Sequence, residues 1–158
     1  MLIASNGKRR KRKDLLSSLS DCGVSLDAMT ESAMALYAPC ESADSNKSRS
    51  EIEKRFRDEL KKRCADPNVS LLVHAALYLD KEYLMNDSEK VAGPAFIIAD
   101  ELIGMSIAEY IGGKKALFNF VRYDRQKPGI LSELGVFLDD AVGGLIAGCM
   151  TKIFEDWG

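Results

Sequence analysis

Apolar residues recur at the spacing of an amphipathic α-helix along most of this chain. The segments with this spacing are about residues 15–19, 26–37, 51–64, 69–84, a segment that ends near Tyr110, and 133–156. The segment 51–64 is the clearest, because its apolar residues recur at every fourth position from Ile52 to Cys64. No segment shows the alternation of apolar and polar residues that strands require. The pattern predicts an all-α fold, a compact bundle of about six helices.

Helix breakers and caps separate these segments. The predicted breaks are Cys22-Gly23, Pro39, Asp66-Pro67, Gly112-Gly113 and Pro128-Gly129. Ser50 and Glu53 have the spacing of a capping box for the helix that follows. Residues 86–88 are predicted to cap the next helix, and Pro94 to kink or restart it. Residues 114–130 are of mixed character, with a short apolar stretch to Phe120 followed by polar residues and the break at Pro128-Gly129.

Charge is distributed unevenly along the chain. Six basic residues, from Lys8 to Lys13, precede Asp14, so residues 1–14 carry a net charge of +5 and residues 15–158 carry −7. We expect residues 1–14 to be a basic flexible leader and residues 15–158 to be a single helical domain. A short basic run without interleaved aromatic residues is a weak signal for nucleic acid. Nucleic-acid binding is therefore not expected, and contact with a membrane surface is not favoured.

The cysteines are Cys22, Cys40, Cys64 and Cys149. None belongs to a Cys-x-x-Cys pair and the chain has one histidine, so a zinc site is not expected. Neither a signal-peptide pattern nor a run of about 18 uncharged apolar residues is present. We therefore expect a soluble, cytoplasmic protein with reduced thiols.

Two pairs of adjacent acidic residues interrupt the most apolar segments. Asp139-Asp140 lies within residues 137–148, which are otherwise apolar or small, and Asp100-Glu101 lies between two apolar stretches. Burying a charge is costly unless the charge is paired or binds a cation. The two pairs therefore predict one site between facing helices for a divalent cation such as Mg²⁺. The alternative for each pair is a charged helix surface or a cap, although the apolar residues 136–138 count against a cap.

Glycines follow the second pair at helical spacing. Gly144 and Gly148 lie one and two turns after Asp140, on the same face of the predicted helix. A glycine inside a helix costs about 1 kcal/mol relative to alanine. Together with Gly104 and Gly143, these glycines indicate close helix–helix approach or access of a ligand to the backbone.

Basic residues lie between the two acidic pairs, in a stretch that contains Arg122, Asp124 and Lys127. Arg and Lys beside a metal site are the partners that an anionic phosphate needs. Asp124 is either a third acidic ligand or a partner of Lys127. The alternative is a charged surface connection, which such clusters usually are.

Two further polar residues stand in apolar surroundings. His74 is expected to be a hydrogen-bonded core residue and not a ligand. Asp80 is either an outer member of the site or a helix-end charge paired with Lys81.

Three motifs follow one another in residues 95–148. They are Asp100-Glu101-x-x-Gly104, Phe120-x-Arg122-Tyr123-Asp124-x-x-Lys127-Pro128, and Gly135-Val136-Phe137-Leu138-Asp139-Asp140-x-x-Gly143-Gly144. Together they resemble the phosphatidylglycerophosphatase A family. Asn119-Phe120 and Lys127-Pro128-Gly129-Ile130 resemble in particular the soluble branch, which includes an archaeal α-ribazole-5′-phosphate phosphatase of cobamide synthesis. The resemblance implies an all-helical fold, Mg²⁺-dependent hydrolysis of phosphomonoesters and a homo-oligomer.

The resemblance and the residue chemistry together suggest roles for the site residues. Those expected to hold one or two Mg²⁺ ions are Asp100, Glu101, Asp139 and Asp140. Those expected to act in catalysis are Asp139, Asp140 and Lys127, and those expected at the phosphate are Arg122, Lys127 and Asp124. Metal-bound water is the expected nucleophile. An Asp nucleophile remains open.

The expected function is hydrolysis of α-ribazole 5′-phosphate in cobamide (vitamin B12) biosynthesis. One alternative is hydrolysis of phosphatidylglycerophosphate at a membrane surface, with the basic leader on anionic lipid. A second alternative is a helical metal-binding or adaptor protein without turnover.

Overall fold

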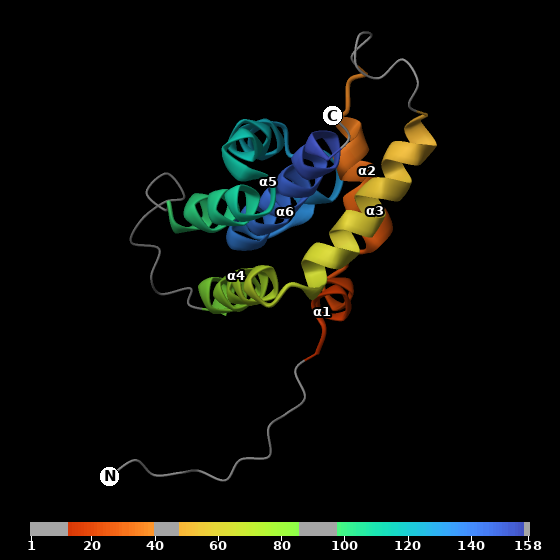
Figure 1. Cartoon of the computed structure of the whole chain (residues 1–158). Helices are drawn as coiled ribbons and strands as arrows, with labels where there is room; N and C mark the ends of the chain where they lie inside the picture. The colour runs from red at the N-terminus through yellow and green to blue at the C-terminus, as the bar shows by residue number, and fades with distance from the viewer. Residues whose placement is uncertain (1–12, 40–47, 86–97, 157–158) are drawn as a thin grey trace, which may run out of the picture.

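The computed structural model describes residues 13–39, 48–85 and 98–156 (Figure 1). The elements within these ranges are α1 (Leu15–Asp21), α2 (Leu26–Ala35), α3 (Arg49–Ala65), α4 (Pro67–Met85), α5 (Ala99–Gln126), the short 3-10 helix η2 (Gly129–Glu133) and α6 (Val136–Glu155). No strand occurs in the described ranges. The predicted all-α bundle is confirmed. Residues 86–88 and Pro94, which were predicted to cap and kink a helix, lie outside the described residues.

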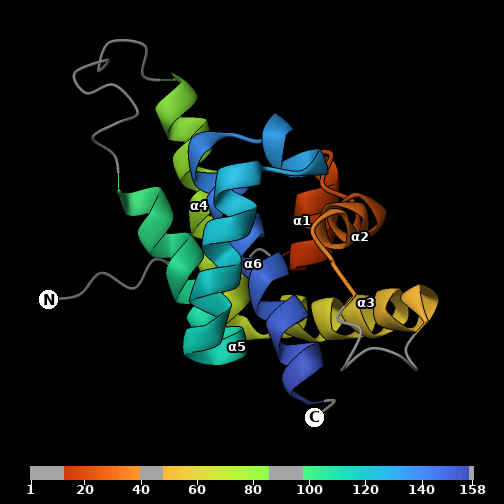
Figure 2. The ribbon, with the colours of Figure 1, turned by 90° about the horizontal axis from the view of Figure 1, so that it is seen from above.

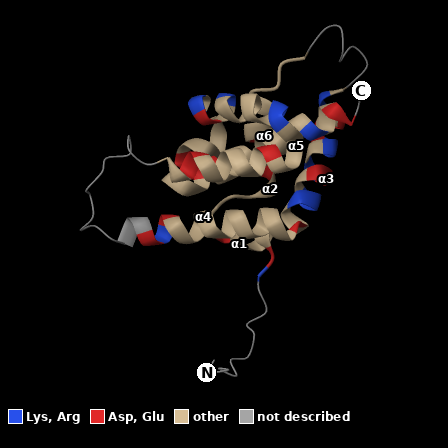
Figure 3. Cartoon of the chain, turned by 60° about the vertical axis from the view of Figure 1, so that its left-hand side comes forward, with Lys and Arg blue, Asp and Glu red and all other residues tan. Residues whose placement is uncertain are grey.

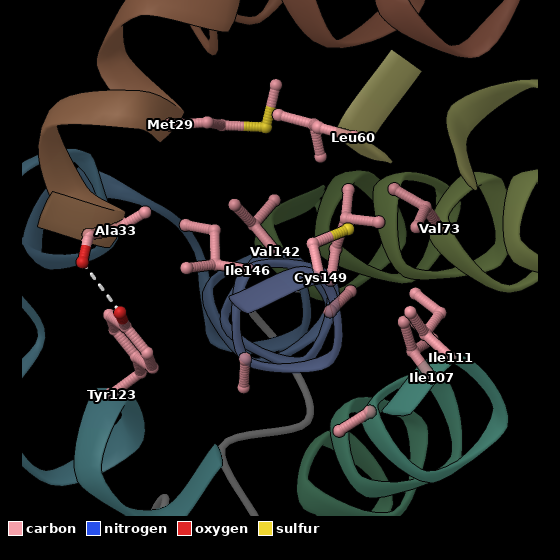
Figure 4. Close-up of a cluster of buried hydrophobic side chains, with 14 of the residues drawn as sticks. Met29, Ala33, Leu60, Val73, Ile107, Ile111, Tyr123, Val142, Ile146 and Cys149 are labelled. Atoms are coloured by element: carbon pink, nitrogen blue, oxygen red, sulfur yellow. Dashed lines mark hydrogen bonds between the residues drawn. The ribbon is translucent and has the colours of Figure 1, made fainter. Parts of the chain in front are cut away.

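Helix α6 forms the centre of the bundle (Figure 2). It contacts α2, α3, α4, α5 and η2, and every residue from Phe137 to Met150 is buried. Figure 4 shows α6 in the core, where Ile146 and Cys149 are surrounded by side chains of the other helices. A helix that is apolar on all its faces can be accommodated only in such a central place. The two acidic residues within this buried stretch, Asp139 and Asp140, are therefore brought into the interior.

Helix α5 folds back on itself at Gly113. This residue has φ 67° and ψ −169°, a conformation that an L side chain rarely adopts. The predicted break at Gly112-Gly113 therefore exists. Helix resumes directly after it and continues to Gln126, through residues whose mixed pattern did not indicate a helix. A Cβ on Gly104 would lie 2.6 Å from the ring of Phe120, so the two halves of α5 lie side by side. The fold-back brings the beginning and the end of α5 to the same end of the bundle (Figure 2).

Local hydrogen bonds fix where the first helices begin. Asp14 caps α1 by accepting from the amide of Ser17 at 3.0 Å. The predicted capping box at Ser50 was wrong, because α3 begins two residues earlier. Its cap is Ser48, whose hydroxyl accepts from the amide of Glu51 at 3.2 Å. Ser48 and Glu51 have the same spacing as Ser50 and Glu53, so the sequence alone fits both registers.

Helices α5 and α6 cross at their glycines. A Cβ on Gly104 would lie 2.6 Å from the carbonyl oxygen of Asp140, and one on Gly112 would lie 2.8 Å from that of Gly148. The predicted close approach of helices at Gly144 and Gly148 is confirmed, whereas a Cβ on Gly143 would meet nothing nearer than 3.8 Å. Across the three described ranges, every helix is too short or too polar to span a bilayer.

Candidate functional site

The acidic pair Asp139-Asp140 lies at the beginning of α6. The helix starts at Val136, with Gly135 as its cap residue, so Asp139 is in the first turn and not in the middle of the helix as the apolar pattern suggested. Both carboxylates are nevertheless buried, since Asp139 is 8% exposed and Asp140 is 3% exposed. Figure 3 shows acidic residues gathered at this end of the bundle, where α4 ends and α5 begins.

Lys127 forms an ion pair with Asp139. Its ammonium group donates to Oδ2 of Asp139 and lies 3.6 Å from Oδ1 of Asp124. Lys127 ends α5 in a left-handed conformation with φ 41°, and its amide donates to the carbonyl of Tyr123 at 2.8 Å. This conformation turns the chain out of α5, while the ammonium group reaches the first turn of α6. The side chain of Lys127 remains 42% exposed, so a ligand in solvent can reach it.

The carboxyl groups raise one another's affinity for protons. Burial, the charges of Asp139 and Asp124, and a hydrogen bond with Asp124 raise the pKa of Asp140 to about 8. Burial also raises the pKa of Asp139, although Lys127 acts in the opposite direction. Burial acts to lower the pKa of Lys127, but the hydrogen bond to Asp139 and the surrounding carboxylates raise it on balance. The site therefore holds an excess of negative charge that one lysine does not neutralise.

Within residues 13–39, 48–85 and 98–156, two buried carboxylate oxygens have no hydrogen-bond partner. They are Oδ1 of Asp100 and Oδ1 of Asp139. A buried unpaired acceptor is rare and costly, and carboxylate oxygens are the ligands that Mg²⁺ prefers. Among the described residues, no group of three or more His, Cys, Asp or Glu side chains is arranged to hold a metal ion. Asp100, Asp139 and Asp140 therefore fit a cation in chemistry and burial, but their side chains do not form a preassembled cage.

Asp80 of α4 caps α6 from outside that helix. Its Oδ1 accepts from the amide of Phe137 at 2.8 Å, and its Oδ2 accepts from the amide of Leu138 at 3.0 Å. Burial raises the pKa of Asp80, and the charge of Asp100 adds to this, while the two amide hydrogen bonds oppose it. The suggestion that Asp80 pairs with Lys81 is replaced by this contact. Sequence reasoning missed the cap because it comes from 57 residues away.

Two of the expected site residues point elsewhere. The guanidinium group of Arg122 donates to the carbonyl of Leu36 at 2.9 Å, where a basic group complements the end of α2. Glu101 is exposed, in contrast to Asp100 beside it. The structure thus brings Asp124, Lys127, Asp139 and Asp140 together, with Asp100 near Asp80, and it does not bring Arg122 to the ion pair.

His74 takes no part in this cluster. Its Nδ1 lies 2.7 Å from the carbonyl oxygen of Ser70, and its Nε2 lies 3.0 Å from the hydroxyl of Ser18. The contact with Ser18 joins α4 to α1. The prediction that His74 is hydrogen-bonded is confirmed, but its side chain is half-buried and not in the core.

Known proteins resemble this chain in sequence and in fold. The family model described as phosphatidylglycerophosphatase A matches residues 60–155. An uncharacterized protein of Methanocaldococcus jannaschii is 44% identical over 117 residues, which cover 70% of this chain and 92% of that protein. The crystal structure of the low temperature requirement C protein from Listeria monocytogenes has a TM-score of 0.71 at 22% identity, covering 91% of this chain and 94% of that one. At this identity, the structural likeness shows the fold.

Proposed function

Since the chain belongs to the phosphatidylglycerophosphatase A family, a family of phosphatases, we propose that it is a Mg²⁺-dependent phosphomonoesterase. The observation that carries the proposal is the position of Lys127, held between Asp139 and Asp124 beside buried carboxylates. Such a site combines an ammonium group that can bind a phosphate with carboxylates that can bind a metal ion. We propose α-ribazole 5′-phosphate as the substrate, because the motifs around Asn119 and Lys127 resemble the soluble branch of the family.

The residues proposed to hold the metal are Asp100, Asp139 and Asp140. Asp100 and Asp139 each have a buried oxygen without a partner, and Asp140 is buried next to Asp139. A divalent cation there supplies charge neutralisation at the phosphoryl oxygens and a lowered pKa of bound water. We assign no role to Glu101, whose side chain is exposed.

Lys127 is proposed to bind the phosphate. An ammonium group has three donors; in this structure the one of Lys127 donates to Asp139 and forms an ion pair with Asp124 at 3.6 Å. Its partial exposure leaves it open to an anionic oxygen. Asp124 and Asp139 hold the ammonium group in place, so it needs little reorganisation when charge develops on the phosphoryl group.

A second candidate substrate is phosphatidylglycerophosphate, which the description of the matching family names. Its reacting group is also a phosphomonoester, so the same residues would serve. The two candidates differ in the rest of the molecule, which is a ribose and a base in one case and a phosphatidylglycerol in the other.

The experiment is a measurement of phosphate release from each ester, with and without Mg²⁺. The wild type is compared with Asp140→Asn and with Asp156→Asn, a control at the opposite, exposed end of α6. The proposal predicts Mg²⁺-dependent release from α-ribazole 5′-phosphate that is lost in Asp140→Asn and kept in Asp156→Asn. Release from the lipid alone would move the assignment to phosphatidylglycerophosphate. No release from either ester, with Mg²⁺ still raising the melting temperature, would identify a metal-binding protein without this activity.

A further inference from the structure

The first turn of α6 is capped by a residue of α4. A helix N-terminus leaves amides without intrahelical partners, and a side chain at the cap residue usually satisfies one of them. Gly135, the cap residue of α6, has no side chain to do so. Both carboxylate oxygens of Asp80 take this place, one on the amide of Phe137 and the other on that of Leu138.

The fit between Asp80 and Gly135 is close. A Cβ on Gly135 would lie 2.5 Å from Oδ2 of Asp80 and 2.6 Å from its Cγ. The backbone of Gly135 has φ −71° and ψ 167°, which any residue adopts without strain. A side chain at residue 135 is therefore excluded by the space that Asp80 occupies. The backbone conformation of residue 135 does not exclude it.

The contacts of Asp80 end one residue before the ion pair. Asp80 packs on Gly135 and binds the amides of Phe137 and Leu138. The next amide, that of Asp139, donates to the carbonyl of Gly135 at 2.9 Å. The backbone that carries Asp139 to Lys127 is thus anchored to α4 through the buried side chain of Asp80, which is 8% exposed.

We propose that Asp80 is a positioning residue, which holds the first turn of α6 so that Asp139 stays against Lys127. The kinetic part of this inference rests on the proposed phosphatase activity, whereas the structural part does not. Partners one shell away from a metal or a reacting group typically change affinity or activity by about 10- to 100-fold when they are replaced. We expect an effect of this size from Asp80→Asn, which keeps one acceptor oxygen and replaces the other with a donor.

The kinetic test uses α-ribazole 5′-phosphate and, if only the lipid is hydrolysed, phosphatidylglycerophosphate. Asp80→Asn should lower kcat per folded molecule by about 10- to 100-fold, with a much smaller change in KM. The matched control is Asp66→Asn, because Asp66 also caps a helix, accepting from the amide of Asn68 at 2.8 Å, but at the start of α4. Asp66→Asn, whose side-chain oxygen can still accept from the amide of Asn68, should keep kcat. Equal kcat in the two variants would overturn the proposal.

A double-mutant cycle tests whether the contact acts through Gly135. Gly135→Ala should lower kcat in the presence of Asp80, because its Cβ displaces the carboxylate. In the background of Asp80→Ala, the same change should have little further effect, since no carboxylate is left to displace. Independent, multiplicative effects of the two changes would show that Asp80 does not act through this contact, and the proposal would fail.

Hydrogen exchange separates this inference from the proposed function. If the wild type releases no phosphate, the proposed function fails, and amide exchange at Asp139 and Asp140 still measures the anchoring. Asp80→Asn should accelerate exchange at these two amides more than at the buried amides of Ile146 and Cys149, and Asp66→Asn should not. Unchanged relative exchange at Asp139 and Asp140 in Asp80→Asn would refute the proposal regardless of any activity.

Discussion

Gly104 of α5 and Gly144 of α6 approach so closely that a Cβ on Gly144 would overlap the backbone carbonyl of Gly104. In the other direction, a Cβ on Gly104 would lie 2.6 Å from the carbonyl oxygen of Asp140. Backbone atoms on both sides form this contact, so no rotamer change can relieve a crowded side chain. The glycines therefore set the distance between the helix that carries Asp100 and the helix that carries Asp140.

The crossing predicts opposite effects of the same substitution at two adjacent glycines. Gly144→Ala should lower the free energy of unfolding by about 1–3 kcal/mol, the typical range for overpacked cores. Gly143→Ala should raise it by about 0.5–1 kcal/mol, because its Cβ meets only ordinary contacts at 3.8 Å and alanine favours helix. Urea unfolding measures both values. Equal changes in the two variants would show that α5 and α6 are not in close contact at Gly144.

Lys127 and Lys152 offer a comparison of two ion-paired lysines near opposite ends of α6. Lys127 pairs with Asp139 in the candidate site, and Lys152 pairs with Asp156 at 2.8 Å. Lys127→Met should lower kcat/KM for the phosphomonoester by about 100-fold or more, as expected for the loss of a preorganised donor. Lys152→Met should leave kcat/KM unchanged. Steady-state kinetics with Mg²⁺ present tests this, and a similar loss in both variants would point to a general effect of charge.

The buried carboxylates predict how the stability of the metal-free protein depends on pH. The pKa of Asp140 is about 8 in the folded protein, against 3.8 as its ordinary value. Between these values the folded state keeps a proton that the unfolded chain has released, so stability falls as pH rises from about 4 to about 8. One such group contributes a slope of at most about 1.4 kcal/mol per pH unit. The raised pKa values of Asp139 and Asp80 act in the same direction.

The difference between Asp140→Asn and the wild type isolates this contribution. Near pH 4 both proteins carry a neutral group at this position, and their free energies of unfolding should be similar. At pH 8 the variant should be the more stable, because it has no charge to bury. Urea unfolding in a chelator at several pH values gives the two curves. Parallel curves would mean that Asp140 is ionised in the folded state throughout, contrary to its burial beside Asp139.

Local patterns in the sequence predicted those parts of the fold that depend on one helix alone. The four-residue spacing from Ile52 to Cys64 gave α3, and the apolar and small residues of 137–148 gave the last helix, α6. The fold-back at Gly113 was half predicted, because a glycine marks the break but not the helix that resumes after it. Helix spacing and helix breaks depend on residues that are close together in the sequence, so the sequence alone can indicate them.

Contacts between distant segments decided the rest of the site. The cap of α6 by Asp80 and the bond from Arg122 to Leu36 join residues 57 and 86 positions apart, and no local spacing signals them. The acidic pairs could be recognised because charge in an apolar helix is unusual. The sequence did not indicate, however, that Asp100 is half buried while Glu101 is exposed. Mg²⁺, the homo-oligomer, the leader of residues 1–14 and the cytoplasmic location stay predictions.

Tyr123, one residue before Asp124, joins α5 to the end of α2. Its hydroxyl donates to the carbonyl of Ala33 at 2.7 Å, and the side chain is 1% exposed (Figure 4). Ala33 lies in the last turn of α2, where carbonyls lack intrahelical partners. Tyr123→Phe should therefore lower the free energy of unfolding by about 1–2 kcal/mol, since it leaves this buried carbonyl unpaired.

The matched control for Tyr123→Phe is Tyr110→Phe. The hydroxyl of Tyr110 donates to Asp66 at 3.1 Å, but this side chain is 50% exposed, so water can replace the bond. Its loss should change the free energy of unfolding by no more than about 0.5 kcal/mol. Urea unfolding of the two variants gives the comparison. Equal and small decreases in the free energy of unfolding would mean that water reaches the carbonyl of Ala33. The contact between α2 and α5 at Tyr123 would then not be buried.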